Sequence, residues 1–217
     1  LPAGRRQRRG DCTFAQPPAR VDTPYLDPDG VLRIARDGAR KGCHEALFTL
    51  GERPEDRYEV ARTWLRDHGY DSTVHYVAAM ADLVLRETGL LPHANAGALS
   101  KDELARLRPV SPSQGMMIES VNPDLEAHRG APDKTPERRL ATLESAGELS
   151  IPFTTGILVG IGDTRADQLA GLAADDVHRG QARDVRSEDE QLPVRRHFRR
   201  ENERAVVGHA RDARAVV

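Results

Sequence analysis

Apolar positions along the chain alternate between two spacings, one typical of helices and one of short strands. After the capping pair Asp27-Pro28, apolar residues recur at helical spacing as far as Gly42, which predicts a first helix there. Residues 45–50 are a short, largely apolar run, which predicts a strand. The same patterns predict further helices at 57–68, 72–88, 100–107 and 136–147 and from 163 or 164, and strands at 90–94, 113–119 and 151–159.

This alternation of strand and helix predicts an α/β fold. Parallel strands joined by right-handed helical crossovers form either a barrel or an open, doubly wound sheet. Ligands bind such sheets at the carboxyl ends of the strands. Four turns lie there, and they converge if the sheet closes into a barrel: residues 51–54, 95–97, 119–120 and 160–163.

A glycine-rich segment after the last predicted strand is the strongest single sign of a ligand site. Gly156, Gly160 and Gly162 have no side chain, so a small molecule can lie against the backbone there. The alternative is a tight turn that needs glycine for its φ angles alone.

Composition excludes several classes of partner. The formal net charge is −2, so no global field favours nucleic acid or an acidic membrane. No apolar run approaches the ~20 residues of a membrane span. Only two cysteines are present, too few for a disulfide scaffold, which predicts a cytoplasmic protein.

Length and charge predict one core and a tail. The 217 residues suit one sizeable domain, which we expect over residues 1–175. Residues 176–217 are dense in charge and poor in large apolar side chains, so we expect a tail that is disordered or loosely helical.

Six segments together resemble one enzyme family. In order, they are GDCTFA at 10–15, EALFTLGERPE at 45–55, GYDST at 69–73, TGLLPH at 88–93, QGMMIE at 114–119 and PFTTGILVGIG at 152–162. Over roughly residues 5–172 the chain resembles the radical S-adenosylmethionine (SAM) half of the 7,8-didemethyl-8-hydroxy-5-deazariboflavin (FO) synthases, which make the chromophore of coenzyme F420.

The resemblance implies a partial (β/α) barrel of the radical SAM type, which we expect to be incomplete at both ends. It implies two cofactors, a 4Fe-4S cluster and S-adenosyl-L-methionine. Cleavage of the latter gives a 5′-deoxyadenosyl radical, which abstracts hydrogen from an adduct of tyrosine and a ribityl-aminouracil. The implied activity is that of a lyase with a small-molecule substrate, and the adduct comes from a partner half of the synthase.

The cluster loop of the family departs from its pattern in this chain. The resemblance implies a Cys-x3-Cys-x2-Cys loop, and Cys12 is the metal ligand that matches it. The other two ligand positions fall on Arg5 and Arg9, and arginine has no lone pair to offer iron. Cys43 follows the first predicted helix and is expected to be a buried thiol rather than a ligand.

The resemblance also implies cofactor-binding residues. Gly51 and Glu52 match the position that holds the SAM amino group, although the carboxylate could instead cap a helix. Glu119 is placed for the ribose hydroxyls. Gly156, Gly160 and Gly162 match the turn around the adenine and methionine parts.

Three hypotheses remain open at this stage. The first is a deazaflavin synthase subunit or domain, a radical SAM lyase. The second is a degenerate, truncated and non-catalytic relative, which the arginines at positions 5 and 9 favour. The third is an unrelated barrel enzyme that binds a phosphorylated sugar. This hypothesis predicts several basic residues near Gly160 to bind the phosphate, and Arg165 is the one basic residue there.

Overall fold

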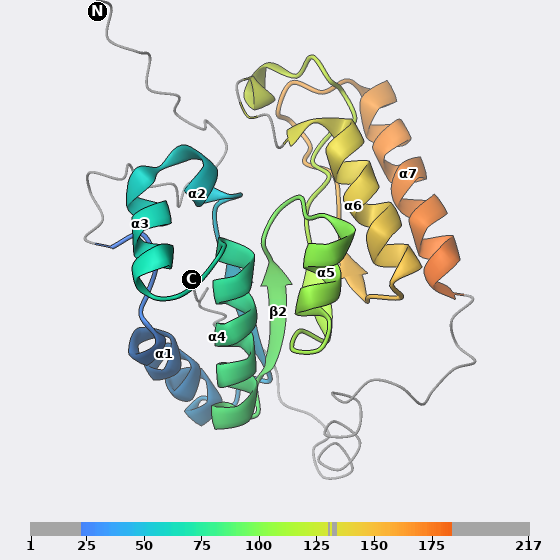
Figure 1. The fold of residues 1–217 in the computed structure, drawn as a ribbon. Helices are drawn as coiled ribbons and strands as arrows, with labels where there is room; N and C mark the ends of the chain where they lie inside the picture. The colour runs from blue at the N-terminus through green and yellow to red at the C-terminus, as the bar shows by residue number, and fades with distance from the viewer. Residues whose placement is uncertain (1–22, 130, 132–133, 184–217) are drawn as a thin grey trace, which may run out of the picture.

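The computed structural model describes residues 23–129, 131 and 134–183, and side chains are described as far as residue 174. Within these ranges the fold is a single parallel sheet with helices packed along it (Figure 1). The predicted α/β class is confirmed. Cys12 and the two arginines at its would-be ligand positions lie outside the described residues.

The sheet has four strands whose spatial order is their order in the chain, β1-β2-β3-β4. All three pairings are parallel, and in the first of them Leu47 lies opposite His93 and Phe48 opposite Ala94. Consecutive parallel strands in sequence order are the arrangement of a (β/α) barrel wall. The strands are β1 (Glu45–Thr49), β2 (Leu91–Asn95), β3 (Ser113–Gly115) and β4 (Phe153–Thr154).

Helices cover one face of this sheet, and α5, α6 and α7 lie side by side in Figure 1. Several begin where the sequence predicts. The side chain of Asp27 accepts a hydrogen bond from Gly30 N, and Ser100 and Glu103 form a reciprocal capping box. The helices are α1 (Pro28–Arg40), α2 (Pro54–Arg57), α3 (Glu59–Asp67), α4 (Thr73–Thr88), α5 (Lys101–Leu107), the 3-10 turn η2 (Glu126–His128), α6 (Pro136–Glu148) and α7 (Arg165–Arg183).

Three predicted elements are wrong in extent. The strands expected at 113–119 and 151–159 are only three and two residues long, and beyond them a single bridge pairs Glu119 with Ile157. Glu119, at the end of the first of these segments, has a φ of 63°, which a regular strand does not accommodate. The helix expected at 57–68 begins two residues later, as α3, because Tyr58 is extended, with φ −125° and ψ 120°, and separates it from α2.

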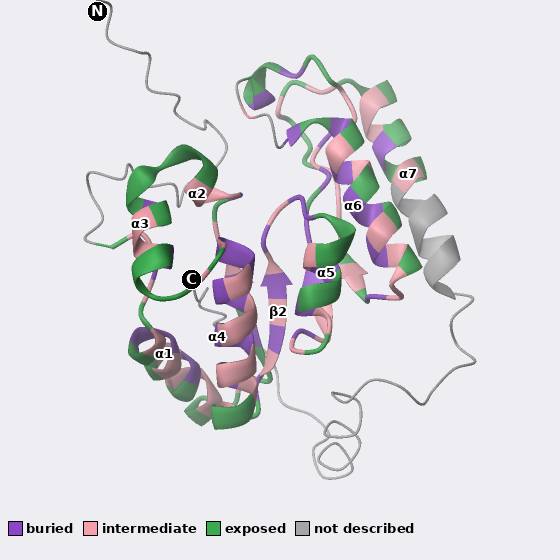
Figure 2. Cartoon of the chain, in the orientation of Figure 1, coloured by how far each residue is buried: buried purple, intermediate pink, exposed green. Residues whose placement is uncertain are grey.

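The main core lies between the sheet and its helices, where α4 and β2 carry many of the buried positions (Figure 2). Val84, Leu104 and Leu107 are fully buried there. A smaller cluster of Ala98, Met116, Ile118 and Leu143 lies beneath α6. This second cluster anchors the backbone that leads into Glu119, because Ile118 is completely buried.

The opposite face of the sheet is more open. Along β1 buried and exposed residues alternate, so Ala46 and Phe48 face the helices while Leu47 is 38% exposed. Leu47 and His93 therefore lie on the face that would line the inside of a closed barrel.

The carboxyl-terminal part of the described chain is helical. α7 begins after Thr164, whose hydroxyl accepts a hydrogen bond from Asp167 N, so Thr164 rather than Asp163 caps it. The helix continues past the predicted boundary at residue 175, and residues 184–217 lie outside the described part of the chain. Among the described helices, none is long and apolar enough to cross a membrane.

Candidate functional site

The loop after β1 places Glu52 inside the protein. Its side chain is 7% exposed, and Oε1 accepts a hydrogen bond of 2.9 Å from the backbone N of Ala98, in the loop after β2. Gly97 makes this possible, since a Cβ there would lie 2.0 Å from Cγ of Glu52, and its φ is +80°. The carboxyl ends of β1 and β2 are thereby joined, as parallel neighbours in a barrel wall allow.

Two further contacts hold this loop. Arg53, next to Glu52, has a left-handed φ of 42° and donates from Nη2 to Oε2 of Glu103 at 2.5 Å. Glu55 accepts a hydrogen bond of 2.9 Å from Thr73 N, at the start of α4. The loop is fixed to α4 on one side and to α5 on the other, so Glu52 between these contacts is held in place.

Arg139 on α6 connects the predicted carboxylates. Its Nη2 donates to Glu52 Oε1 at 3.0 Å, its Nη1 donates to the carbonyl of Met117, and Nη1 lies 3.9 Å from Glu119 Oε1. The Arg139 side chain is 4% exposed. Glu52 and Glu119 therefore lie beside the same buried cation. They are 67 positions apart in the sequence and are predicted separately to bind SAM.

Glu119 has two more cationic or polar neighbours. Its Oε2 accepts hydrogen bonds from Nε2 of His128 at 2.8 Å and from Nζ of Lys134 at 2.6 Å. Both donor residues are 8% exposed. The carboxylate predicted to meet ribose hydroxyls is thus already held through one of its oxygens.

The predicted glycines divide into two groups. Gly156 lies beside Glu119, since its carbonyl accepts from Glu119 N at 3.0 Å, and a Cβ on Gly156 would meet only Met117 Sδ, at 3.5 Å. Gly160 and Gly162 have φ values of +90° and +102°, which favour glycine for the turn itself. Gly51 has open space at its Cβ position, so all four positions leave the backbone accessible or nearly so.

Sequence reasoning missed Arg139, Lys134 and His128. One signal could have identified Arg139, because it shares a helical face with residues that belong to the core. The face contains buried positions three, four and seven residues away: Pro136, Thr142, Leu143 and Ala146. An arginine in the middle of such a stripe is buried, and a buried arginine requires anionic or carbonyl partners.

His93 lies on the open face of the sheet. Its Nδ1 is 2.7 Å from Oγ of Ser113, and a Cβ on Gly115 would lie 2.8 Å from its Nε2. Burial lowers the pKa of His93 below its ordinary value of 6.5, against a weaker opposing effect of Glu45. The imidazole is therefore a neutral group beside the strand ends at pH 7.

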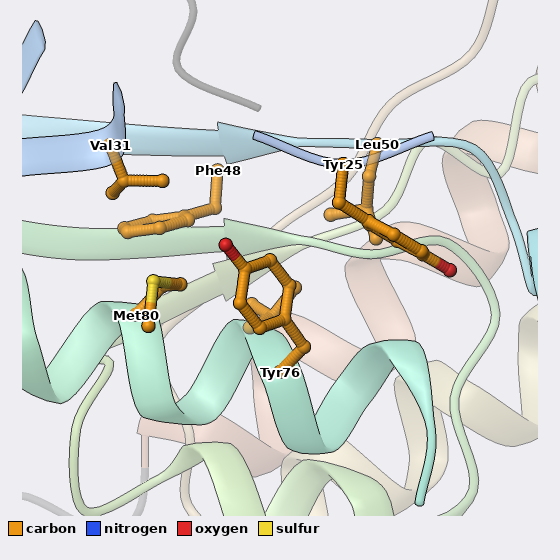
Figure 3. Close-up of a pocket in the computed structure, with 7 residues that line it drawn as sticks. Tyr25, Val31, Phe48, Leu50, Tyr76 and Met80 are labelled. Carbon is orange, nitrogen blue, oxygen red and sulfur yellow. The ribbon is translucent and has the colours of Figure 1, made fainter. Parts of the chain in front are cut away.

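A small apolar hollow lies elsewhere, between α1, β1 and α4 (Figure 3). Its volume is about 20 Å³, enough for about one water molecule, so it has no room for a nucleoside. The two tyrosine hydroxyls near it are satisfied, Tyr25 by Thr73 and Tyr76 by the carbonyl of Leu26. We assign it to packing. Its lining is Tyr25, Val31, Phe48, Leu50, Tyr76, Val77 and Met80.

The residues present do not fit a cluster held by three thiolates. The sequence contains two cysteines, and one of them, Cys43, follows the end of α1, where its Sγ would contact a Cβ placed on Gly38. Among the described residues no three His, Cys, Asp or Glu side chains are grouped as metal ligands. A cubane held on three cysteines therefore lacks at least one ligand in this chain.

A parallel sheet in barrel order, with buried carboxylates and glycines at its carboxyl edge, defines an α/β domain of the barrel class. The family model for the radical SAM superfamily matches residues 9–172. The chain belongs to this superfamily, which generally uses SAM and a 4Fe-4S cluster. The fold agrees with that of methylornithine synthase, with a TM-score of 0.55 at 16% identity over 70% of this chain and 41% of that one.

Curated relatives are more similar in sequence. An FO synthase from Mycobacterium tuberculosis is 53% identical over 173 residues, which are 74% of this chain and 20% of the relative. A 7,8-didemethyl-8-hydroxy-5-deazariboflavin synthase from Methanopyrus kandleri is 44% identical over 77% of this chain and 51% of its own length. The chain thus spans about a fifth of the first relative and about half of the second.

Proposed function

We propose that this chain is the radical SAM portion of an FO synthase, the enzyme that closes the deazaflavin ring of coenzyme F420, and that the carboxyl edge of its sheet is the SAM site. The observation that carries the proposal is the joining of Glu52 and Glu119 through Arg139, at the strand ends where the family resemblance expects the cofactor. The similarity to the Methanopyrus kandleri synthase supports the same activity.

The site residues fit SAM chemically. Oε2 of Glu52 is buried and has no hydrogen-bond partner within the described part of the chain, and such an acceptor suits a ligand group that donates hydrogen bonds, as an amino group does. Gly51 leaves the adjoining backbone open. Glu119 and Gly156 lie together and would receive the ribose and adenine, with Gly160 and Gly162 shaping the turn beyond.

With a 4Fe-4S cluster in place, SAM would supply radical chemistry at this edge, but this chain lacks the three thiolates that would hold the cluster. The residues of this chain bind and orient the nucleoside and its amino-acid part. The proposal includes a small-molecule adduct made by a partner half of the synthase, a cytoplasmic location, and no nucleic-acid or membrane partner.

A second candidate function is favoured by one observation, the arginines at the two remaining cluster-ligand positions, Arg5 and Arg9. In this second function, the chain binds the nucleoside at the same site but performs no radical chemistry, because it does not hold the cluster. We assign no reaction step through the cluster, because the thiolates to hold it are lacking.

Two measurements separate these functions. Calorimetric titration with S-adenosylhomocysteine tests the site, and Gly51→Ala is expected to weaken binding at least tenfold, while Gly38→Ala in α1 serves as the matched control. Anaerobic reconstitution with iron and sulfide tests the cluster: we expect about four irons per chain only in Arg5→Cys/Arg9→Cys. Deazaflavin formation by the unmodified chain would exclude the second function, and absence of nucleoside binding by the folded chain would exclude the proposed site.

A further inference from the structure

The two oxygens of the Glu119 carboxylate have different surroundings. Oε2 receives both hydrogen bonds, from His128 and from Lys134. Oε1 lies 3.9 Å from Arg139 Nη1, beyond hydrogen-bond length, and within the described part of the chain no hydrogen bond reaches it. The Glu119 side chain is also more exposed, at 15%, than the side chains of Arg139, His128 and Lys134, at 4–8%.

The backbone at Glu119 is fixed as tightly as its side chain. Its N donates to the carbonyl of Gly156 at 3.0 Å, and its own carbonyl accepts from Leu158 N at 2.8 Å. Its φ of 63° is a strained conformation for a residue with a Cβ, and such a residue persists only where its surroundings hold it. The remaining freedom, rotation of the carboxylate, is removed by the two donors on Oε2.

We infer that His128 and Lys134 are positioning residues that tether Oε2 of Glu119 so that Oε1 faces the ligand and accepts a hydrogen bond from a ribose hydroxyl of a bound nucleoside. This inference rests on the proposed nucleoside site at the same edge. Lys134 supplies the opposite charge that a buried carboxylate requires, and His128 supplies direction, since an Nε2–H that points at Oε2 fixes the plane of the carboxylate.

The imidazole also has a defined form in this arrangement. Nε2 faces a carboxylate oxygen and therefore carries a proton, whereas Nδ1 is buried with no partner within the described residues. Glutamine can place an N–H where Nε2 lies, so His128→Gln preserves the tether, whereas His128→Phe keeps the ring and removes the donor.

The test compares two ligands, 5′-deoxyadenosine and its 2′,3′-dideoxy analogue, which lacks both ribose hydroxyls. Affinity for each is measured by calorimetry in the full chain, after circular dichroism has confirmed folding. A charge-assisted hydrogen bond predicts that the unmodified chain prefers the hydroxylated ligand at least tenfold. Lys134→Met and His128→Phe are expected to reduce this preference to threefold or less, as Glu119→Ala does, whereas His128→Gln retains it.

The ratio between the two ligands is informative because a general loss of structure weakens both equally. Lys101→Met, which removes an exposed lysine paired with Glu148, is the matched control and should leave the ratio unchanged. If Lys134→Met does not fold, His128→Phe still decides the question. A hydroxyl preference that survives both changes overturns the inference and leaves the proposed site intact. Failure of the folded, unmodified chain to bind either nucleoside overturns both.

Discussion

Replacing Arg139 by methionine removes the cation that the two site carboxylates share. Methionine matches much of the arginine stem, so the change leaves little cavity and chiefly deletes the charge. Among the described residues, Glu52, 7% exposed, would then retain only the Ala98 N–H as a partner. Breaking a buried pair in this way costs about 3–5 kcal/mol, which is a third or more of the stability of many domains.

The consequence is measurable as a loss of thermal stability. For a domain of this size, 1 kcal/mol lowers the melting temperature by about 2–4 °C, so Arg139→Met should melt about 6–20 °C below the unmodified chain. Circular dichroism on heating, with urea titration for the free energy, is the assay. The exposed pair of Lys101 and Glu148 gives the scale of a surface effect, since Lys101→Met should cost only about 0.2–1 kcal/mol.

A double-mutant cycle identifies the cause. Glu52→Gln keeps an acceptor for Ala98 N but removes the negative charge that Arg139 balances. The double variant should therefore lose less stability than the sum of the single losses, by about 1–3 kcal/mol. Strict additivity, or a loss below 1 kcal/mol for Arg139→Met, would refute the view that these charges form one buried unit.

Other parts of the fold give three further predictions. His93→Gln should flatten the pH dependence of stability between pH 7 and 5, as melting curves at several pH values would reveal. Burial lowers the folded-state pKa of His93, so the contribution of this side chain to the free energy of unfolding is present above the ordinary pKa of 6.5 and declines as the pH falls. Gln114→Met should be neutral or stabilising in urea titration, because Oε1 of this fully buried side chain has no partner among the described residues and Leu104 O keeps its bond from Arg108 N; a loss above 2 kcal/mol would contradict this. Leu107→Ala should cost about 2–5 kcal/mol by the same assay, since Leu107 is completely buried, and a change below 1 kcal/mol would show that the site collapses freely.

The sequence predicted local features better than tertiary ones. Caps such as Asp27 and the Ser100–Glu103 box depend on residues three positions apart, so helix starts could be predicted from adjacent residues. The strand expected at 113–119 is only three residues long, and the segment after it ends at Glu119 in a left-handed conformation that is stabilised by His128, Lys134 and the bridge to Ile157. Those contacts are tertiary and have no signature near position 119.

The same limit applied to the candidate site. Glu52 and Glu119 could be predicted from the family resemblance, because each follows a recognisable strand segment. Their connection through Arg139 could not, since the polar side chain that links them comes from a helix surface 87 positions beyond Glu52. The helical pattern indicates that Arg139 is buried, but its two carboxylate partners depend on how α6 packs against the sheet.

The distance in sequence between Glu52 and Arg139 has a consequence for how the protein is made. A chain that leaves the ribosome from its amino end presents the β1 loop long before α6 exists, and until then the Glu52 carboxylate lacks the Arg139 cation that accompanies it in the interior. We expect this loop to stay hydrated in nascent chains that stop before residue 139, and to close over Glu52 only when α6 docks. Docking of α6 would then be a late step that completes the carboxyl edge of a preformed set of strands, so pulse-labelling hydrogen exchange should show Ala98 N protected after the amides of α4.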